Sequence, residues 1–260
     1  MSLRLMLSCA EASGDLYAGA LTRELRSIEP GVRIAGLGGP RFQEAGGELV
    51  SDYRGIAVTG LTEALGKIPT SIALLRRLTA FARAERPDAL IAIDSPDFNF
   101  ALASRVKRLG IPVVYYISPQ VWAWRRGRLK TIRRIADRML VIFPFEQQIY
   151  QDAGVPVEFV GHPLIELARV TSSRDVFLPA LGLDAGAPTI ALLPGSRHNE
   201  VHRILPVLAS AIPLIRRHLP SAQFVVARAP HLDDALFAPV APVDRCVVVD
   251  ENTDTALASA

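Results

Sequence analysis

Two carboxylates and an amide follow a short apolar run and are the residues of this chain best suited to acid–base chemistry. The run 89–93 has the pattern of a buried parallel strand, and Asp94, Asp97 and Asn99 come directly after it. Ligands of open α/β sheets bind outside the carboxyl ends of the strands. A carboxylate placed there can orient a substrate hydroxyl or accept its proton. Either aspartate can instead cap the following helix, because Asp is a favoured N-cap residue.

A second strand end carries groups that suit a phosphate. Residues 192–197 read LLPGSR, a strand followed by a glycine turn and an arginine. Gly195 lets the backbone approach an anion closely, and the amides that open the next helix direct positive dipole toward it. Arg197 adds a planar, permanently charged donor. We expect Gly195, Ser196, Arg197 and Glu200 to bind a nucleotide phosphate, although an ordinary β-turn is the alternative.

The order of apolar runs and helical patterns indicates an α/β protein with two parallel sheets. Expected strands of the first half are residues 3–9, 32–35, 89–93, 113–117, 138–142 and 157–160. The composition changes after residue 164, and a second strand–helix series begins at residue 189. We therefore expect two Rossmann-like, doubly wound domains, at 1–164 and 189–260, with a linker at 165–188 and the second domain incomplete.

Composition excludes several classes of protein. The chain has 260 residues, 50% of them hydrophobic and 21% charged, as in folded globular proteins. A net charge of +3 is too small to indicate nucleic acid as a partner. Cys9 and Cys246 are far apart, which favours reduced thiols in the cytosol. No apolar run approaches the roughly 18 residues that a membrane span needs, so we expect any membrane contact to be peripheral.

Neither a metal nor an organic cofactor is expected. His198 and His202 have the i, i+4 spacing of some zinc sites, but Glu200 stands on the opposite side of such a helix. Exposed helix histidines are the simpler interpretation. The chain also has no GxGxxG fingerprint, and Arg41 takes the place of the third glycine in the loop 36–41. A nicotinamide-dependent dehydrogenase is therefore disfavoured.

Six motifs occur in the same order as in a known family. They are residues 11–15 (EASGD), 93–99 (IDSPDFN), 117–125 (ISPQVWAWR), 143–146 (FPFE), 160–163 (VGHP) and 192–197 (LLPGSR). In these motifs the chain resembles the lipid-A-disaccharide synthases, which are inverting glycosyltransferases of the two-domain B type. The resemblance implies transfer of 2,3-diacylglucosamine from its UDP derivative to 2,3-diacylglucosamine 1-phosphate, which gives a β-1,6-linked disaccharide and UDP.

The same resemblance suggests individual roles. The proposed base of the family falls on Asp97, with Asp94 and Glu11 as further carboxylates beside the same cleft. The substrate-binding residues that it implies are Ser13, Gly14, Asn99, Trp124 and Arg125. Family members continue through a glutamate-bearing nucleotide loop and a final helix that packs back on the first domain. We therefore expect this chain to be truncated, and a homodimer only for the full length.

The substrate of such an enzyme is a membrane lipid, and one segment suits contact with lipid. Residues 56–83 combine many apolar side chains with Lys67, Arg76, Arg77 and Arg83. Interfacial surfaces combine apolar and cationic groups in this way, although helices that face a core have the same stripe. Trp122 and Trp124 suit either an interface or core packing.

A second cationic region follows the tryptophans. It consists of Arg125, Arg126, Arg128, Lys130, Arg133, Arg134 and Arg138, opposed only by Asp137. We expect these charges to meet phosphate on a lipid rather than nucleic acid. The expected location is the cytoplasm, at the inner leaflet of the inner membrane of a Gram-negative bacterium. Two alternatives stay open: a non-catalytic acyl-glucosamine-binding remnant, and another UDP-sugar enzyme such as a 2-epimerase.

Overall fold

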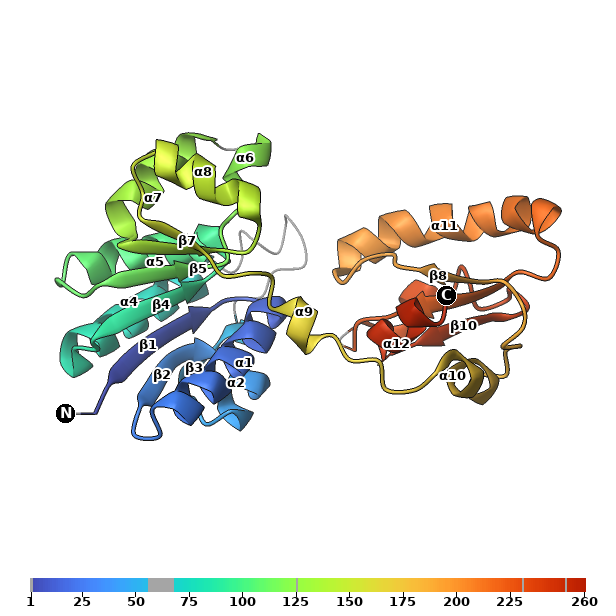
Figure 1. Cartoon of the computed structure of the whole chain (residues 1–260), viewed down its shortest axis with the longest axis horizontal. Helices are drawn as coiled ribbons and strands as arrows, with labels where there is room; N and C mark the ends of the chain where they lie inside the picture. The colour runs from blue at the N-terminus through green and yellow to red at the C-terminus, as the bar shows by residue number, and fades with distance from the viewer. Residues whose placement is uncertain (1, 56–67, 125, 231, 251) are drawn as a thin grey trace. The chain divides into compact units, whose positions relative to one another are not determined.

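The computed structural model describes residues 2–55, 68–124, 126–230, 232–250 and 252–260 (Figure 1). The chain divides into two compact units, one reaching to Ile165 and the other running from Glu166 to Ala260. Each unit contains one parallel sheet covered by helices. The expected α/β class with two Rossmann-like sheets is therefore confirmed.

The sheet of the first unit has seven parallel strands in the order β3-β2-β1-β4-β5-β6-β7. The strands are β1 (Arg4–Cys9), β2 (Arg33–Gly38), β3 (Glu48–Asp52), β4 (Ala89–Ile93), β5 (Val113–Tyr116), β6 (Arg138–Val141) and β7 (Val157–Phe159). The strand order reverses between β1 and β4. Such a reversal opens a crevice at the carboxyl ends of the two strands, where ligands of open α/β sheets bind.

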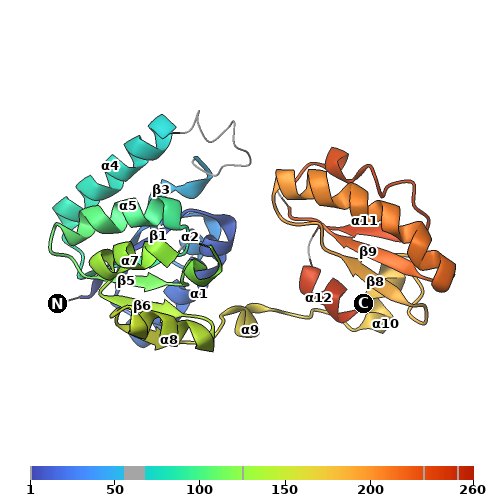
Figure 2. The same ribbon diagram turned by 90° about the horizontal axis from the view of Figure 1, so that it is seen from above.

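Helices cover both faces of this sheet. They are α1 (Ala12–Ile28), α2 (Pro40–Glu44), α4 (Ile68–Glu85), α5 (Pro96–Lys107), α6 (Val121–Trp124), α7 (Leu129–Ile135) and α8 (Pro144–Asp152), with short 3₁₀ turns at Tyr53–Gly55 and Arg126–Arg128. On one face, Leu78 of α4 and Leu102 of α5 pack against Leu90 and Val113 of the sheet. Figure 2 shows α4 and α5 together on that side. On the other face, α1 and α2 form a second core.

Local sequence explains where the key helices begin. Pro96 occupies the first turn of α5, where its missing N–H costs nothing and its fixed φ suits a helix. Pro69 occupies the same kind of position in α4. The apolar pattern of the sequence predicts that this helix starts at about residue 72, but it begins at Ile68. Pro69 does not prevent the earlier start, because proline is tolerated in the first turn of a helix. No helix in the described part of the chain could span a membrane.

The second unit contains a three-stranded parallel sheet in the order β10-β9-β8. Its elements are α10 (Arg174–Ala180), β8 (Thr189–Leu192), α11 (His198–His218), β9 (Gln223–Ala227), a 3₁₀ turn (Asp234–Phe237), β10 (Cys246–Val249) and α12 (Thr253–Ala258); the short α9 (Leu164–Leu167) precedes them. Helix α10 lies within the range expected to be a linker. Its Phe177 and Leu178 are buried against Val225 and Ala256, so this part of the range folds with the second unit.

Candidate active site

The carboxyl ends of β1 and β4 bring two acidic motifs together at the strand-order reversal. Glu11 follows β1 and is the N-cap residue of α1, while Ser95 follows β4 and is the N-cap residue of α5. The Ser95 hydroxyl donates a long hydrogen bond, 3.5 Å, to Glu11 Oε1. The structure therefore places Glu11 beside the loop that carries Asp94 and Asp97, as expected for ends of neighbouring parallel strands.

The backbone of this loop is held in an unusual conformation. Asp94 and Ser95 have φ values of 42° and 45°, which non-glycine residues rarely adopt. Hydrogen bonds to two backbone carbonyls hold it there. Asn99 Nδ2 donates to Ile93 O at 2.9 Å and to Asp94 O at 2.8 Å, and the Tyr115 hydroxyl donates to Asp94 O at 2.6 Å. Strained backbone of this kind persists where the surrounding contacts over-determine it, which is common at functional sites.

Asn99 positions this loop and has no exposed surface. The resemblance implied that it binds substrate, but the side chain is fully buried. Its Oδ1 accepts a hydrogen bond from the Ser8 hydroxyl at 2.7 Å, and its Nδ2 donates to the carbonyls described above. Because its polar atoms are committed inside the protein, Asn99 fixes the geometry of Asp94 and does not contact a ligand in this conformation.

Asp97 presents its carboxylate at the start of α5 and is bound by an arginine. Its side chain is 85% exposed, whereas that of Arg128 is only 22% exposed. Arg128 Nη2 donates to Asp97 Oδ1 at 2.5 Å, and its guanidinium lies 5.5 Å from the centre of the Phe100 ring. The cation is therefore anchored by packing and holds an accessible carboxylate in place. From the sequence, Arg128 was predicted only as one of several basic residues in the region 125–138, and not as the partner of Asp97.

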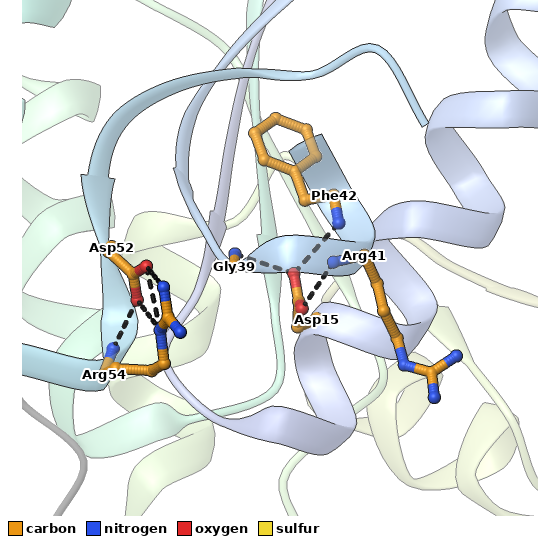
Figure 3. Close-up of polar contacts among 6 residues, drawn as sticks. All are labelled: Asp15, Gly39, Arg41, Phe42, Asp52 and Arg54. Atoms are coloured by element: carbon orange, nitrogen blue, oxygen red, sulfur yellow. Dashed lines mark hydrogen bonds and ion pairs between the residues drawn. The ribbon is translucent and has the colours of Figure 1, made fainter. Parts of the chain in front are cut away.

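Asp15 of α1 lies at the same edge of the sheet, next to the residues that follow β2. Its side chain is buried, and Oδ1 accepts hydrogen bonds from the backbone N–H groups of Gly39 (2.7 Å) and Phe42 (3.1 Å), while Oδ2 accepts one from Arg41 (3.0 Å) (Figure 3). These N–H groups open the short helix α2, which has no side-chain cap of its own. The carboxylate of Asp15 thus joins α1 to α2.

Gly14 is required by packing at the start of α1. A Cβ atom there would lie 2.9 Å from the Cβ of Cys9, so only glycine lets the helix approach the end of β1 this closely. Gly14 is buried, while its neighbour Ser13 is exposed. Of these two expected substrate-binding residues, only Ser13 is therefore exposed at the surface.

The tryptophan motif lies on α6, next to α8. The ring of Trp122 meets that of Phe145 edge to face, with centroids 5.1 Å apart, and Phe145 stacks on Phe143. Trp122 is thus packed against protein. Trp124 ends α6, and Arg125 lies outside the described residues, as do residues 56–67 of the segment expected to contact lipid.

Glu146 is a buried carboxyl group behind this motif. Its Oε2 accepts the backbone N–H of Phe143 at 3.2 Å and so caps α8. Burial raises the pKa of Glu146, and the hydrogen bond from Phe143 opposes that rise only in part. The folded protein therefore retains this proton to a higher pH than the unfolded chain does.

A pH-dependent loss of stability follows from this raised pKa. As pH rises above the ordinary glutamate range and through the folded pKa, the free energy of unfolding should fall, because only the unfolded chain releases the proton freely. The variant Glu146→Gln keeps an oxygen that can accept from Phe143 but has no proton to lose. We expect it to gain stability relative to the wild type as pH rises, measured by urea unfolding of the first unit. Glu24→Gln, at an exposed site on α1, is the control; parallel pH curves for wild type and Glu146→Gln would contradict the assignment.

In the second unit the glycine turn is closed by a glutamate. Glu200 Oε2 accepts hydrogen bonds from the backbone N–H groups of Ser196 (3.1 Å) and Arg197 (3.2 Å), and its Oε1 accepts one from Arg197 Nη1 at 3.2 Å. Gly195 has φ 117°, and a Cβ there would lie 2.6 Å from the Cβ of Glu200. The expected phosphate-binding amides are thus held by a carboxylate of the chain itself, so a phosphate must displace Glu200 to reach them.

His198 and His202 lie exposed on the first turns of α11, with stacked rings whose centroids are 6.2 Å apart. Among the residues that the structure describes, no group of three or more His, Cys, Asp or Glu side chains could hold a metal ion.

Solved structures with the same architecture define the class of fold. The S. aureus MnaA structure with UDP matches with a TM-score of 0.68 at 10% identity, over 100% of this chain and 71% of that one. The UDP-GlcNAc 2-epimerase of Neisseria meningitidis bound to UDP-GlcNAc matches with a TM-score of 0.67 at 10% identity, over 99% and 74%. The chain therefore has the B-type fold of these structures.

Within this class, sequence similarity is much closer to one family. A family model described as lipid-A-disaccharide synthetase matches residues 5–260. The lipid-A-disaccharide synthase of Anaeromyxobacter sp. (strain K) is 44% identical over 96% of this chain and 66% of its own length. That of Syntrophus aciditrophicus is 47% identical over 90% and 61%. The chain belongs to the lipid-A-disaccharide synthetase family, and it spans less than two thirds of the length of these relatives.

Proposed function

We propose that the protein containing this chain is an inverting glycosyltransferase. It moves 2,3-diacylglucosamine from UDP to the 6-hydroxyl of 2,3-diacylglucosamine 1-phosphate and releases UDP. Membership of the family supports this proposal. The single observation in the structure that carries it is the meeting of the Glu11 and Asp94–Asp97 motifs where the strand order reverses. That edge offers carboxylates to a hydroxyl acceptor.

Asp97 is the general base of this proposal. Its carboxylate is accessible and is oriented by Arg128, so it can take the proton of the attacking hydroxyl. The acceptor oxygen then forms a bond to the anomeric carbon as the bond from that carbon to the UDP oxygen breaks. Attack from the opposite face inverts the configuration and gives the β linkage. Glu11 and Asp94 line the same edge and position the acceptor.

Groups of the second unit stabilise the negative charge that develops on the leaving diphosphate. Arg197 supplies a charged donor, and the amides of Ser196 and Arg197 become available when Glu200 releases them. These groups stabilise the leaving group electrostatically. Glu200 thus keeps the turn in shape without ligand and exchanges with phosphate when the donor binds.

Membrane contact belongs to the same proposal. We place the protein on the cytoplasmic side of the inner membrane of a Gram-negative bacterium, and as a homodimer at full length. Within the described residues, support comes from the start of α4, where Ile68 and Ile72 are 49% and 42% exposed. Arg76 and Arg77 are exposed further along the same helix. Exposed apolar side chains combined with cations suit an anionic membrane surface.

Arg197→Ala tests the donor site. Loss of a charged hydrogen bond costs about 1.5–3 kcal/mol, so KM for the UDP-sugar should rise about 10- to 100-fold. The readouts are donor kinetics and the Kd of UDP, in a protein extended to the length of its relatives. Glu200→Gln is the companion variant, because it keeps an oxygen for the amides but removes the competing negative charge; it should bind UDP at least as tightly as the wild type. Unchanged donor kinetics for Arg197→Ala would remove this residue from the phosphate site.

The proposed reaction is tested by acceptor-dependent release of UDP. The same extended protein is incubated with UDP-2,3-diacylglucosamine, with and without the monosaccharide 1-phosphate. We expect release of UDP only when the acceptor is present. Release without acceptor would contradict the proposal. So would conversion of UDP-GlcNAc to its C2 epimer, followed by NMR in a separate incubation with UDP-GlcNAc.

A further inference from the structure

A basic hollow lies between α5 and α7 of the first unit. Its volume is about 240 Å³, and it is lined by Ser104, Lys107, Arg108, Thr131, Arg134 and Ile135. Three of these six side chains are cationic and two carry hydroxyl groups. No carboxylate contributes to the lining.

The two arginines of the basic hollow have donors left for a ligand. Arg108 Nε donates to Ser104 O at 3.2 Å, and Arg134 Nε donates to Lys130 O at 3.3 Å. These bonds fix the arginine stems and leave the terminal N–H groups of both guanidinium ions. Among the described residues neither arginine forms an ion pair, whereas Lys107 is paired with Asp137. The basic hollow therefore carries net positive charge.

The chemistry of the lining fits a phosphate group. Planar guanidinium donors match phosphate oxygens, and hydroxyl groups can donate to the same oxygens. Ile135, only 4% exposed, lines the hollow with apolar surface.

The basic hollow is separate from the candidate active site. Asp97 stands at the start of α5 and Lys107 at its end, so ten residues of helix, roughly 15 Å, lie between them. Asp137, the partner of Lys107, accepts a hydrogen bond from the N–H of Val113 at the amino end of β5. The basic hollow thus lies toward the amino ends of the strands, opposite the edge that carries the catalytic candidates.

The helices that form the basic hollow share a layer with α4. Leu78 of α4, Val106 of α5 and Ile135 of α7 belong to one core cluster on one face of the sheet. The start of α4 in this layer exposes Ile68 and Ile72. This helical layer thus carries exposed apolar side chains toward the carboxyl ends of the strands and the cationic hollow toward their amino ends. A layer with both kinds of group suits the surface of an anionic membrane.

We propose that the basic hollow binds the phosphate group of an anionic lipid headgroup. The inference extends the membrane contact of the proposed function and rests on it, but it concerns residues outside the transfer chemistry. The hollow anchors the first unit to the membrane surface from which its lipid substrates come.

The test compares two charge reversals with a matched control. Arg108→Glu and Arg134→Glu each alter the basic hollow, while Arg23→Glu makes the same charge change at an exposed site on α1, on the other face of the sheet. Co-sedimentation is measured with vesicles of phosphatidylcholine alone and of phosphatidylcholine mixed equally with phosphatidylglycerol. Each hollow variant should bind the anionic vesicles about tenfold or more weakly than the wild type, and the control should change little. Circular dichroism confirms that the variants are folded.

Three results would overturn the inference. They are equal losses in hollow and control variants, no loss in the hollow variants, and binding of inorganic phosphate that the variants abolish while vesicle binding is unchanged. The last result would assign the hollow to free phosphate. Transfer from detergent-dispersed substrates should be normal in both hollow variants. If the wild type shows no transfer but only the hollow variants lose vesicle binding, the proposed function fails and the headgroup site stands.

Discussion

Asp97→Asn is expected to lower kcat/KM for sugar transfer by about 10²–10⁴-fold, the usual contribution of a positioned general base. The amide retains the size of the carboxylate but cannot accept the proton of the acceptor hydroxyl. Because the Asp97 side chain is 85% exposed, the variant should fold normally and bind UDP as the wild type does. The measurement is steady-state release of UDP with saturating acceptor, together with the Kd of UDP.

The control for Asp97 is an exposed aspartate elsewhere in the first unit. Asp152→Asn removes an exposed carboxylate at the end of α8 that accepts a hydrogen bond from Gln148, and it should leave transfer unchanged. If Asp97→Asn keeps more than about a tenth of the wild-type rate, the decrease in rate is smaller than the removal of a general base should cause. Asp94 or Glu11 would then be the carboxylate to examine.

Asp15→Ala is expected to cause a large loss of stability in the first unit. Three backbone N–H groups, those of Gly39, Arg41 and Phe42, lose their acceptor (Figure 3). The N–H groups of Gly39 and Phe42 are buried, and that of Arg41 is partly buried. An unsatisfied buried donor costs about 1–3 kcal/mol, so the free energy of unfolding should fall by at least about 2 kcal/mol. Urea unfolding of the first unit measures the change.

A neighbouring aspartate separates this effect from a general loss of charge. The guanidinium of Arg54 donates hydrogen bonds to the Asp52 carboxylate (Figure 3). These bonds lower the pKa of Asp52. The Arg54 side chain is 66% exposed and that of Asp52 is 31% exposed. Asp52→Ala should cost less than about 1 kcal/mol, as exposed ion pairs usually do. If Asp15→Ala and Asp52→Ala lower the free energy of unfolding equally, the three backbone hydrogen bonds do not stabilise the fold more than an exposed ion pair does.

Much of the fold could be predicted because its strands are buried. The runs Ala89–Ile93 and Gln223–Ala227 begin and end where their apolar patterns indicate. Strand β3 was missed because it lies at the edge of the sheet and buries none of its residues fully. Helix α2 was missed because it has five residues and is capped by Asp15, more than twenty positions earlier in the chain.

The candidate site was predictable as far as sheet topology determines it. Glu11 and Ser95 meet because they follow neighbouring parallel strands. The pairing of Asp97 with Arg128 was not predictable, because it joins residues 31 positions apart and depends on where the turn after α6 falls. Glu200 was expected to bind phosphate, but an arginine at the N-cap gave no sign of the capping box that the glutamate completes.

The most direct test of the central claim is the identity of the product. A protein in which this chain is extended to the length of its relatives is incubated with UDP-2,3-diacylglucosamine and 2,3-diacylglucosamine 1-phosphate, and the products are resolved by mass spectrometry and NMR. The proposal predicts a β-1,6-linked tetraacyl disaccharide 1-phosphate and one UDP for each disaccharide formed. Recovery of both substrates unchanged, or a product with an α linkage, would contradict it.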